Sequence, residues 1–519
     1  MASTFFGLTI AYSGLQAANT SLTITGHNVS NINTKGYTKQ QAGTQAADAL
    51  RTHTTYGAIG SGVVVTEISQ IRDSYYDVKY RNNMANYGQY SVKESYMGQI
   101  EDYLDEFTLN GYSQEYKNFF SAVNQLTITP GDTSAKNQLI NNAKSLADYF
   151  NTLTTNLRNV QADANNEIKD AVQQINSYAK NIAALNRQIN QIEANYGNAN
   201  DLRDKRNAMI DELSEIVNLE TSEEDMGNNV SNFSVRINGQ TLVSSYSYNT
   251  LETVARIDKK NYSDAEGLYD VQWNSGQKFD MYSTSLSGHL KGLIDIRDGN
   301  NGEHENIETD DDGNNVTDSD GNLVLTTAPA ADKTVSYKGV PYYQAQLNEF
   351  AKIFSDAVNK IMKSGYTSDG SSKGISLFVT QPNTTVMSAG NITVNPELLK
   401  NADLLAIKKE QNDGESDAKI MEELNKLQSE KIFAGGTGSY FLESIVSDMS
   451  IDSQKAVNLY KNYTDLKTSI HNQRLSIMGV DTDEEAMDMI KYQQAYNLNS
   501  KMMSVMNQIY DKLINQTGI

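Results

Sequence analysis

The chain has 519 residues, which is enough for about three domains of ordinary size. Its 43 Lys and Arg residues against 64 Asp and Glu residues give a net charge of -21, which disfavours a nucleic-acid partner. Cysteine is absent, so disulfides, thiolate catalysis and cysteine metal sites are excluded, and no apolar run is long enough to cross a membrane. Residues 1–34 carry no Lys, Arg, Asp or Glu, so we expect a cytoplasmic protein or one exported without a cleaved signal.

The N-terminal segment has the pattern of a long helix with a heptad repeat. Its heptad positions are Leu8, Leu15, Leu22 and Val29, and Ala11, Ala18, Thr25 and Ile32 follow each of them by three residues. A seam of this spacing, rich in small residues, is typical of helices that pack closely together.

The C-terminal segment carries a second seam of alternating three- and four-residue steps. Its members are Met489, Tyr492, Tyr496, Asn499, Met503, Met506, Tyr510 and Leu513. A single stripe of this kind more often marks an ordinary amphipathic helix on a globular core. Here both ends carry a seam, and neither the first 129 nor the last 123 residues contain proline. The sequence therefore favours terminal helices that pair with each other or with neighbouring copies.

Helical patterns also fill most of the region between the two ends. They cover residues from about 85 to 220, 347–362, 420–433 and 451–478. A seam from Ile175 to Tyr196 is expected to end at Tyr196-Gly197-Asn198, with the glycine at the C-cap, and another helix begins at Asp201.

The pattern changes to a period of two in the middle of the chain. Phe233, Val235 and Ile237 alternate before Asn238-Gly239, a type I′ turn signal, so a hairpin is expected there. A second hairpin is expected between 269–273 and 279–281. The predicted fold is mainly α with a β-rich insertion. Residues 1–70 and 480–519 would form a terminal coiled-coil domain, residues 71–228 and 344–479 a helical-bundle body, and residues 229–343 an inserted β-rich outer domain.

No motif assembles a catalytic or metal site. The acidic run from Glu303 to Asp320 nearly has EF-hand spacing, but Ser319 stands where a bidentate Glu is required, so a solvated loop is the favoured interpretation. The sequence His304-Glu305-Asn306-Ile307-Glu308 begins like a zinc-protease helix but lacks the second histidine. We therefore predict no catalytic residues, no metal and no cofactor.

One polar motif follows the first helix. Residues 26–40 read GHNVSNINTKGYTKQ, in which Asn28, Asn31 and Asn33 precede Gly36 and Tyr37. Asparagine bonds its own backbone in turns and glycine accepts positive φ, so this motif predicts a defined turn at the helix exit, anchored by the tyrosine ring.

At these residues the sequence resembles the bacterial flagellar rod, hook and hook-associated proteins. Asn28, Asn31, Asn33, Gly36 and Tyr37 match the N-terminal signature of that family. The segments 483–486 (DEEA) and 492–496, with Gln493, Gln494 and Ala495, match its C-terminal signature. The segments 201–217 and 389–399 are most similar to the hook-associated members.

The resemblance implies an extracellular structural protein of the flagellum rather than an enzyme. It implies export without a cleaved signal peptide through the type III export apparatus, with an export chaperone, and polymerisation at the distal end of the hook. The implied partners are copies of itself, the hook protein and a second hook-associated junction protein, with no nucleic acid and no membrane insertion. A hook or distal rod subunit is an alternative, disfavoured by the helical body at 140–220. A flagellum-borne hydrolase is a remote one, disfavoured by the broken zinc motif.

Overall fold

The computed structural model describes residues 6–51, 58–109, 112–299, 303–310, 314–317, 323–329, 337–382, 386–414, 416–433 and 435–516. The chain divides into two compact units, each built from segments distant in sequence. The first comprises Met1–Ala85, Ile175–Thr250 and Tyr463–Ile519, and the second comprises Asn86–Gln174 and Leu251–Asn462. The fold is mainly α with small sheets, as predicted.

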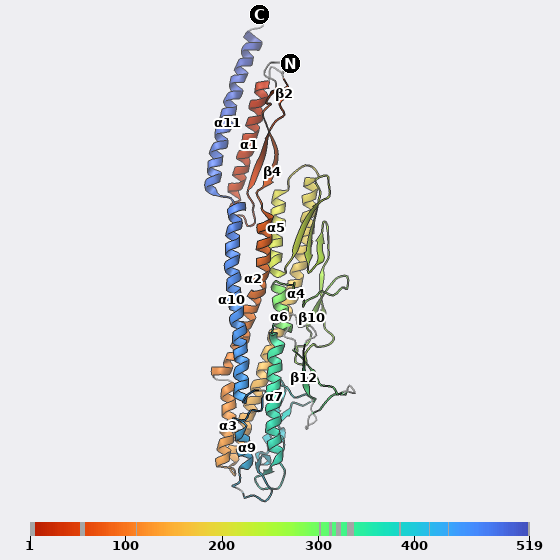
Figure 1. Ribbon diagram of the computed structural model, residues 1–519, viewed down its shortest axis with the longest axis vertical. Coiled ribbons are helices and arrows are strands. Elements are labelled where there is room, and N and C mark those ends of the chain that lie inside the picture. The colour runs from red at the N-terminus through yellow and green to blue at the C-terminus, as the bar shows by residue number, and fades with distance from the viewer. Residues whose placement is uncertain are drawn as a thin grey trace. The chain divides into compact units, whose positions relative to one another are not determined.

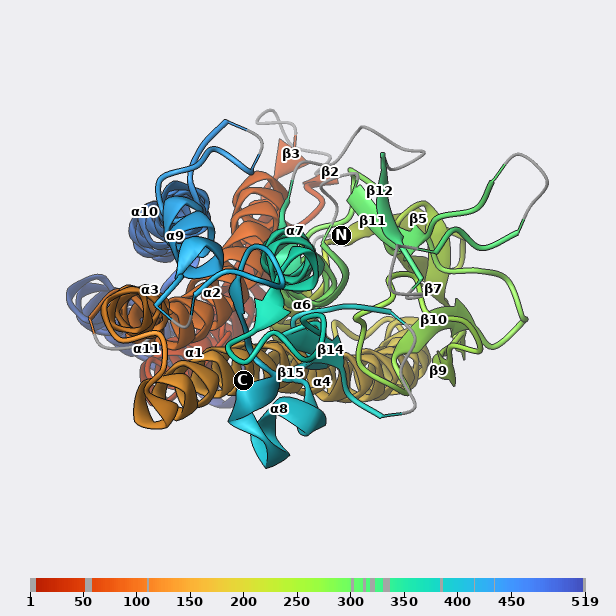
Figure 2. The same cartoon turned by 90° about the horizontal axis from the view of Figure 1, so that it is seen from below.

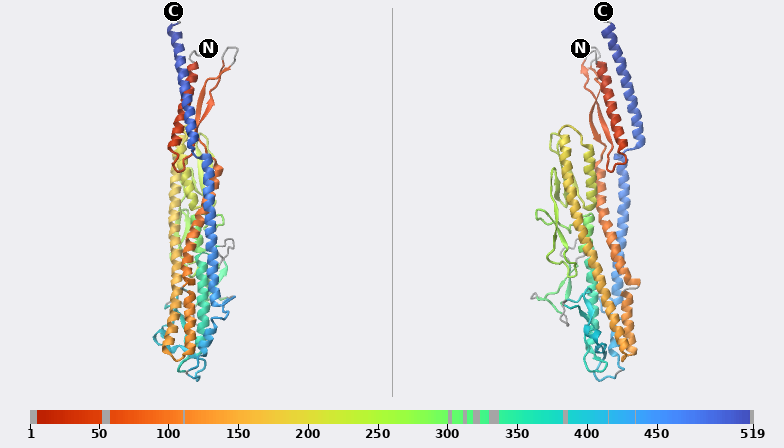
Figure 3. Two further views of the ribbon diagram at one scale, coloured as in Figure 1. Left: turned by 90° about the vertical axis from the view of Figure 1, so that its left-hand side faces the viewer. Right: turned by 180° about the vertical axis from the view of Figure 1, so that it is seen from behind.

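The terminal helices of the first unit lie side by side. Helix α1 (Phe6–Ser30) runs along α11 (Thr482–Asp511), as two views of the chain agree (Figure 1; Figure 3), and α11 ends in the π-helical turn η2 (Lys512–Gln516). The antiparallel pair β1 (Gln40–Ala46) and β4 (Val63–Gln70) packs against α1, and β2 (Leu50–Arg51) pairs with β3 (Ala58–Ile59). The terminal region predicted as helical over 1–70 therefore also contains a β-ribbon.

The rest of the first unit consists of helical segments and a small sheet. It holds the beginning of α2 (Ser74–Leu109), the ends of α4 (Thr133–Glu193) and α10 (Gly438–Met478), and all of α5 (Asn200–Ile216). The sheet has the order β5 (Glu220–Asp225), β6 (Ser231–Ile237), β7 (Gln240–Ser244) and β8 (Ser247–Tyr248). The predicted hairpin is confirmed, since β6 and β7 pair across Asn238 and Gly239, whose φ angles are 49° and 77°.

The turn after α4 lies where the sequence predicted it, but with a different residue in the left-handed conformation. Tyr196 has φ 61°, and the Gly197 N–H donates to the Ile192 carbonyl at 3.2 Å. Tyr196 is 90% exposed, and its left-handed conformation costs roughly 1–2 kcal/mol relative to glycine.

The second unit is a helical body with an aromatic core. It contains the rest of α2, α4 and α10 with α3 (Tyr112–Ile128), α6 (His289–Asp298), α7 (Gly339–Ser364), α8 (Pro396–Lys400), η1 (Ala402–Leu404) and α9 (Lys419–Lys426). Helix α7 packs against α6 and α9, and α9 packs against α3 (Figure 2). The ring of Phe350 stacks on Phe433 with centroids 4.8 Å apart, and Phe354, Phe119 and Tyr116 extend this cluster. Aromatic burial of this extent supplies much of the apolar driving force for folding.

The second unit also contains short antiparallel strand pairs. They are β9 (Leu251–Ala255) with β10 (Tyr269–Trp273), β11 (Glu303–Ile307) with β12 (Leu325–Pro329), β13 (Tyr366–Thr367) with β16 (Ala406–Lys408), and β14 (Phe378–Thr380) with β15 (Ile392–Val394). The predicted second hairpin is confirmed around its turn, and β10 also pairs with β9, which was not predicted. The Trp273 N–H donates to the Gln277 carbonyl at 2.8 Å, the Phe279 N–H donates to the Val271 carbonyl at 3.3 Å, and Gln272 bridges to Lys278.

The β-rich insertion predicted over 229–343 is not a single unit. Strands β6 to β8 belong to the first unit, whereas β9 to β12 belong to the second. The same range contains α6, in which Leu290, Leu293 and Ile294 are fully buried at helical spacing. The short helix was missed because its ten residues lie between stretches of β-type alternation.

Candidate functional site

Helices α1 and α11 approach each other closely because small residues line their contact. The residues of α1 buried there include Ala11, Ala18 and Thr25. A Cβ atom at Gly7 would lie 2.9 Å from Met506 Cε, and one at Gly14 would lie 2.7 Å from Asn499 Oδ1. The Asn499 side chain is held by a hydrogen bond to the Ala495 carbonyl, so Gly14 is needed for the close approach of the helices, whereas the end of Met506 can shift at Gly7.

The predicted N-terminal seam lies beside this contact rather than at its centre. Leu8, Leu15, Leu22 and Val29 are all half-buried. The buried positions are instead those that follow the first three by three residues, where the side chains are small. In the described chain the heptad residues therefore keep exposed apolar surface that is available to another helix.

The predicted C-terminal seam faces α1 along most of its length. Its half-buried members are Tyr492, Tyr496, Asn499, Met503, Met506 and Tyr510, and Ala495 is half-buried beside them. Met489 and Leu513 are 40% and 55% exposed and do not lie on the packed face. Leu513 lies about two turns beyond Met506, which already faces Gly7 near the described start of α1. At the other end the buried residue is Glu485, and Met489 is off the line from Glu485 through Asp488 to Tyr492.

A second apolar row on α11 faces solvent. Leu498, Met502, Val505 and Ile509 follow the same four- and three-residue steps and are each 44% exposed or more. They lie one residue before the packed seam positions at 499, 503, 506 and 510, so α11 carries two neighbouring apolar rows, only one of which is covered by α1 in the described chain.

The motif after α1 forms a buried hydrogen-bond cluster around Asn28, which is 1% exposed. Its Nδ2 donates to Glu485 Oε1 at 3.1 Å and to the Gln40 carbonyl at 3.0 Å. Its Oδ1 accepts from the Tyr37 hydroxyl at 2.7 Å and from the Gln40 N–H at 3.0 Å. Asn28, Tyr37, Lys39, Gln40 and Glu485 are called the Asn28 cluster below. The cluster ties the exit of α1 to the first turn of α11.

Tyr37 and Gly36 shape the turn that brings this cluster together. Burial raises the pKa of Tyr37, and the charges of Asp201, Asp204 and Glu485 raise it further, so its hydroxyl stays protonated and able to donate. Gly36 has φ 81°, and a Cβ atom there would lie 3.0 Å from the Ala208 side chain. The turn therefore needs glycine for both its conformation and its close approach to α5.

The other residues of the two signatures are not part of the cluster. Asn31 Nδ2 donates to the His27 carbonyl at 3.0 Å, and His27 Nδ1 lies 2.9 Å from the Tyr37 hydroxyl. Asn33 is exposed, and Gln493 and Gln494 are exposed on α11. The structure thus brings together Asn28, Gly36 and Tyr37, whereas the two glutamines point away from the packed face.

Lys39 closes the cluster on the α11 side. Its Nζ lies 2.7 Å from Glu484 Oε2 and 3.2 Å from Glu485 Oε1, and its N–H donates to the Met478 carbonyl at 2.9 Å. Burial lowers the pKa of Lys39, but its bonds to the two glutamates outweigh burial and leave the pKa raised. The sequence analysis did not single out Lys39 or Glu485. The DEEA segment of the C-terminal signature was the available signal for Glu485.

A chain of ion pairs holds the segments next to the cluster. Arg474 lies 2.8 Å from Asp77 Oδ1 and 2.6 Å from Asp211 Oδ2. Arg72 also pairs with Asp77 at 2.7 Å, and Arg81 pairs with Asp211 at 2.7 Å. These alternating charges connect α2, α5 and the end of α10 within the first unit. Except for Arg72 and Asp77, the partners are far apart along the chain, so sequence spacing could not reveal them.

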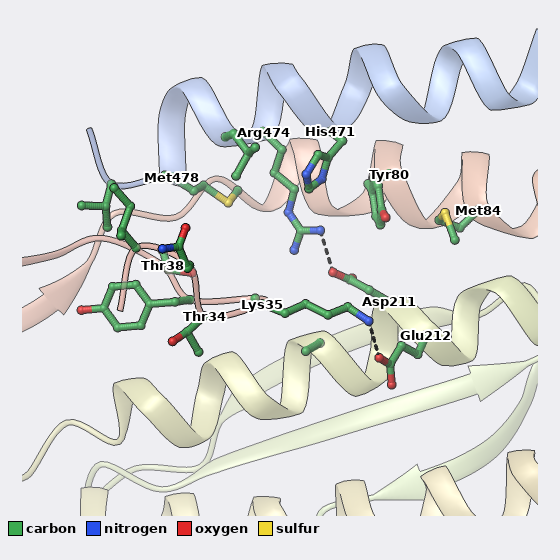
Figure 4. A pocket seen from close by; sticks show the side chains of 18 of the residues that line it. Thr34, Lys35, Thr38, Tyr80, Met84, Asp211, Glu212, His471, Arg474 and Met478 are labelled. Carbon is green, nitrogen blue, oxygen red and sulfur yellow. Dashed lines mark hydrogen bonds and ion pairs between the residues drawn. The ribbon is translucent and has the colours of Figure 1, made fainter. Parts of the chain in front are cut away.

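A cavity of about 600 Å³ opens beside this network. Figure 4 shows the turn after α1, α2, α5 and the end of α10 around it, with Lys35 directed to Glu212 and Arg474 to Asp211. The Lys35–Glu212 ion pair is 2.7 Å long. The Arg474–Asp211 pair is largely buried and helps to hold α5 and the end of α10 in place, whereas the exposed Lys35–Glu212 pair contributes little.

The suspected metal motifs gain no support from the residues that the structure describes. Among them, no group of three metal-ligating side chains is found. Residues 311–313 and 318–320 of the acidic run lie outside the described residues. The His304–Glu308 segment begins in β11 rather than in a helix, so the geometry of a zinc-protease motif is not formed. No described helix has the length and apolar character that crossing a membrane demands.

Comparison with known proteins places the chain among flagellar proteins. The model of the flagellar hook-associated protein FlgK helical domain matches residues 97–378, and the model of the flagellar basal body rod FlgEFG protein C-terminal region matches residues 471–516. Flagellar hook-associated protein 1 of Bacillus subtilis is 26% identical over 100% of this chain and 99% of its own. That of Salmonella typhimurium is 28% identical over 97% of this chain and 98% of its own.

A solved structure shows a similar fold. The flagellar hook junction protein FlgK from Burkholderia pseudomallei superposes with a TM-score of 0.60 at 14% identity, covering 77% of this chain and 100% of that chain. The paired terminal helices, the helical body and these matches define an axial structural protein of the bacterial flagellum. More specifically, the chain belongs to the flagellar hook-associated protein FlgK family, whose helical-domain model covers more than half of it. The resemblance stated from the sequence is thereby confirmed.

Proposed function

We propose that this protein is a structural subunit of the hook–filament junction, which polymerises at the distal end of the hook and is needed for filament assembly. The family match and the relatives named hook-associated protein 1 support this function. A hook or rod subunit fits less well, because the matched helical domain is that of the hook-associated protein.

The observation that carries the proposal is the uncovered apolar row of α11. Leu498, Met502, Val505 and Ile509 form a stripe beside the α1–α11 contact, and a helix that buries only one of two apolar rows has surface left for another helix. The half-buried residues Leu8, Leu15, Leu22 and Val29 add to this surface on α1. The occupants are the terminal helices of neighbouring copies of this chain.

The remaining partners follow from this position in the flagellum. They are the hook protein on one side, the second hook-associated junction protein on the other, and an export chaperone with the type III export apparatus before assembly. The protein acts outside the cell and keeps its N-terminus, and it has a structural rather than an enzymatic role.

A pair of matched double variants tests the proposal. Val505→Asp with Ile509→Asp places two carboxylates in the uncovered apolar row. Ser504→Asp with Gln508→Asp adds the same charge to exposed polar positions of the same helix. We expect the first variant to leave hooks of normal length without filaments, and the second to support filaments. Full-length filaments on cells carrying only the first variant would contradict the proposal.

A further inference from the structure

A second cavity, of about 460 Å³, lies wholly within the second unit and belongs to none of the features described above. Its wall includes Lys93 of α2, Lys291 and Asp295 of α6, Tyr337 before α7, and Lys455 of α10. These elements meet closely, since a Cβ atom at Gly292 would lie 2.7 Å from the Gln89 carbonyl oxygen. The close approach of α6 to α2 brings the two lysines to one place.

The charges in the wall do not balance. Lys93 Nζ lies 2.6 Å from Asp295 Oδ2, and Lys291 Nζ lies 2.8 Å from Asp295 Oδ1. The three side chains are 6%, 4% and 2% exposed, so two buried ammonium groups share one buried carboxylate. The exposed Lys455 and the half-buried Asp452, which accepts from the Tyr343 hydroxyl at 3.3 Å, also line the cavity and add one charge of each sign. A buried charge without a counter-charge is costly, so the site favours an additional anion.

Hydrogen-bond donors in the wall are also left over. The hydroxyl of Tyr337 is buried and has no hydrogen-bond partner among the described residues, and Asp295 Oδ1, although 2.8 Å from Lys291 Nζ, accepts no hydrogen bond there either. The ring of the same tyrosine lies 4.1 Å from Lys93 Nζ, so its face already contacts that ammonium group. Beyond Asp295, Lys93 has no other hydrogen-bond acceptor in the part of the chain that the structure describes. Burial lowers the pKa of Lys93, and the charges of Lys291 and Lys455 lower it further, against the effect of Asp295.

We propose that this cavity binds a small oxyanion, a phosphate or carboxylate group, through Lys93, Lys291 and the Tyr337 hydroxyl. The oxyanion would supply the missing negative charge and accept the free hydrogen bonds of the ammonium and hydroxyl groups. The cavity volume exceeds that of inorganic phosphate, so the group can also belong to a larger molecule or to an acidic side chain of a partner.

Isothermal titration calorimetry of the full chain tests this, with sodium phosphate and sodium acetate as separate probes and sodium chloride at equal ionic strength as the reference. We expect saturable binding of at least one of the two oxyanions, and the probe that binds identifies the chemistry. Lys93→Met is expected to weaken that binding at least ten-fold, because the remaining Lys291–Asp295 pair is neutral. Lys259→Met, which removes a lysine paired with Glu266 on the surface of the same unit, should leave it unchanged.

Tyr337→Phe removes only one hydroxyl and keeps the test decisive if Lys93→Met fails to fold. Losing one hydrogen bond to a bound anion is expected to weaken binding by roughly five-fold or more. Absence of saturable binding of either oxyanion to the unmodified chain would overturn the proposal. Equal affinity in every folded variant would overturn it as well.

Discussion

Asn28 and Glu485 are 457 positions apart in sequence, yet Asn28 Nδ2 donates to Glu485 Oε1 at 3.1 Å and both side chains are 1% exposed. Asn28 lies in the last turn of α1, and Glu485 lies in the first turn of α11. The two terminal signatures therefore meet in a single buried contact, which holds α1 and α11 together at the point where both leave the rest of the first unit.

Asn28→Ala is expected to loosen this contact. It removes the buried amide that bonds Glu485, Tyr37 and the backbone of Gln40. Each of these buried groups left without a partner costs roughly 1–3 kcal/mol. Lys39 still pairs with Glu485, so the loss should be local. Hydrogen exchange should quicken in the last turn of α1 and the first turn of α11. Asn33→Ala, at an exposed position of the same motif, is the control, and equal exchange in the two variants would refute the role given to Asn28.

Gly14 of α1 faces α11, whereas Gly26 of the same helix does not, so substitutions at the two positions are expected to have opposite effects on the stability of α1. At Gly14, leucine would overlap the Asn499 side chain, and overpacking of this kind costs about 1–3 kcal/mol. At Gly26 a Cβ atom would meet no described atom within 4 Å, so alanine should stabilise α1 by up to about 1 kcal/mol. Hydrogen exchange of α1 amides should be faster in Gly14→Leu and slower in Gly26→Ala. A change in the same direction in both would show that the helices do not touch at Gly14.

The parts of this structure that were predicted from the sequence depend on local patterns. The seam of α11 could be predicted because its members from Tyr492 to Tyr510 repeat at helical spacing. The β6–β7 hairpin could be predicted because Asn238-Gly239 suits a type I′ turn. The pairing of β10 with β9 was missed, because a strand's partner is chosen by packing that the alternation of its own residues does not encode.

The candidate site was predicted only in part for the same reason. The asparagine and tyrosine of the first signature were identified, but their link to Glu485 needs the fold to bring the two ends of the chain together. The heptad leucines were expected at the centre of the helix contact. The structure has small residues there, because Gly7 and Gly14 let the helices approach more closely than leucine side chains would allow.

Asp298 predicts how the second unit responds to acid. Its carboxylate pairs with Arg256 and Arg297, each at 2.7 Å. Burial raises the pKa of Asp298, but the two arginines outweigh burial and hold the pKa well below its usual range. Because the folded pKa is depressed, this stabilisation is present above the unfolded pKa of about 3.9 and is lost as pH falls below it, by roughly 1.4 kcal/mol per pH unit.

Asp298→Asn should therefore destabilise the second unit at neutral pH by about 3–5 kcal/mol, because it leaves the buried Arg297 without its counter-charge and Arg256 with Asp270 alone. The single tryptophan, Trp273, is buried in this unit and reports its unfolding by urea. We expect the difference from the unmodified chain to shrink between pH 4 and pH 2.5. Asp258→Asn, at an exposed position, is the control. A difference that stays constant over this pH range would show that Asp298 is not the group responsible.

Substitutions at Met506 and Leu513 distinguish the packing of α1 against α11 within one chain from packing between neighbouring copies. Met506 faces Gly7, so Met506→Asp places a carboxylate in the α1–α11 contact, where an unpaired charge is unfavourable even at a half-buried position. Hydrogen exchange of α1 should quicken and filaments should be lost, while hooks keep their length and the second unit still folds. Leu513 is exposed, so Leu513→Asp should leave the exchange of α1 unchanged. If Leu513 contacts a neighbouring copy, as the seam predicts, this variant still shortens or abolishes filaments. Normal filaments with Leu513→Asp would remove that residue from the assembly surface, and normal filaments with Met506→Asp would contradict the role of the paired terminal helices.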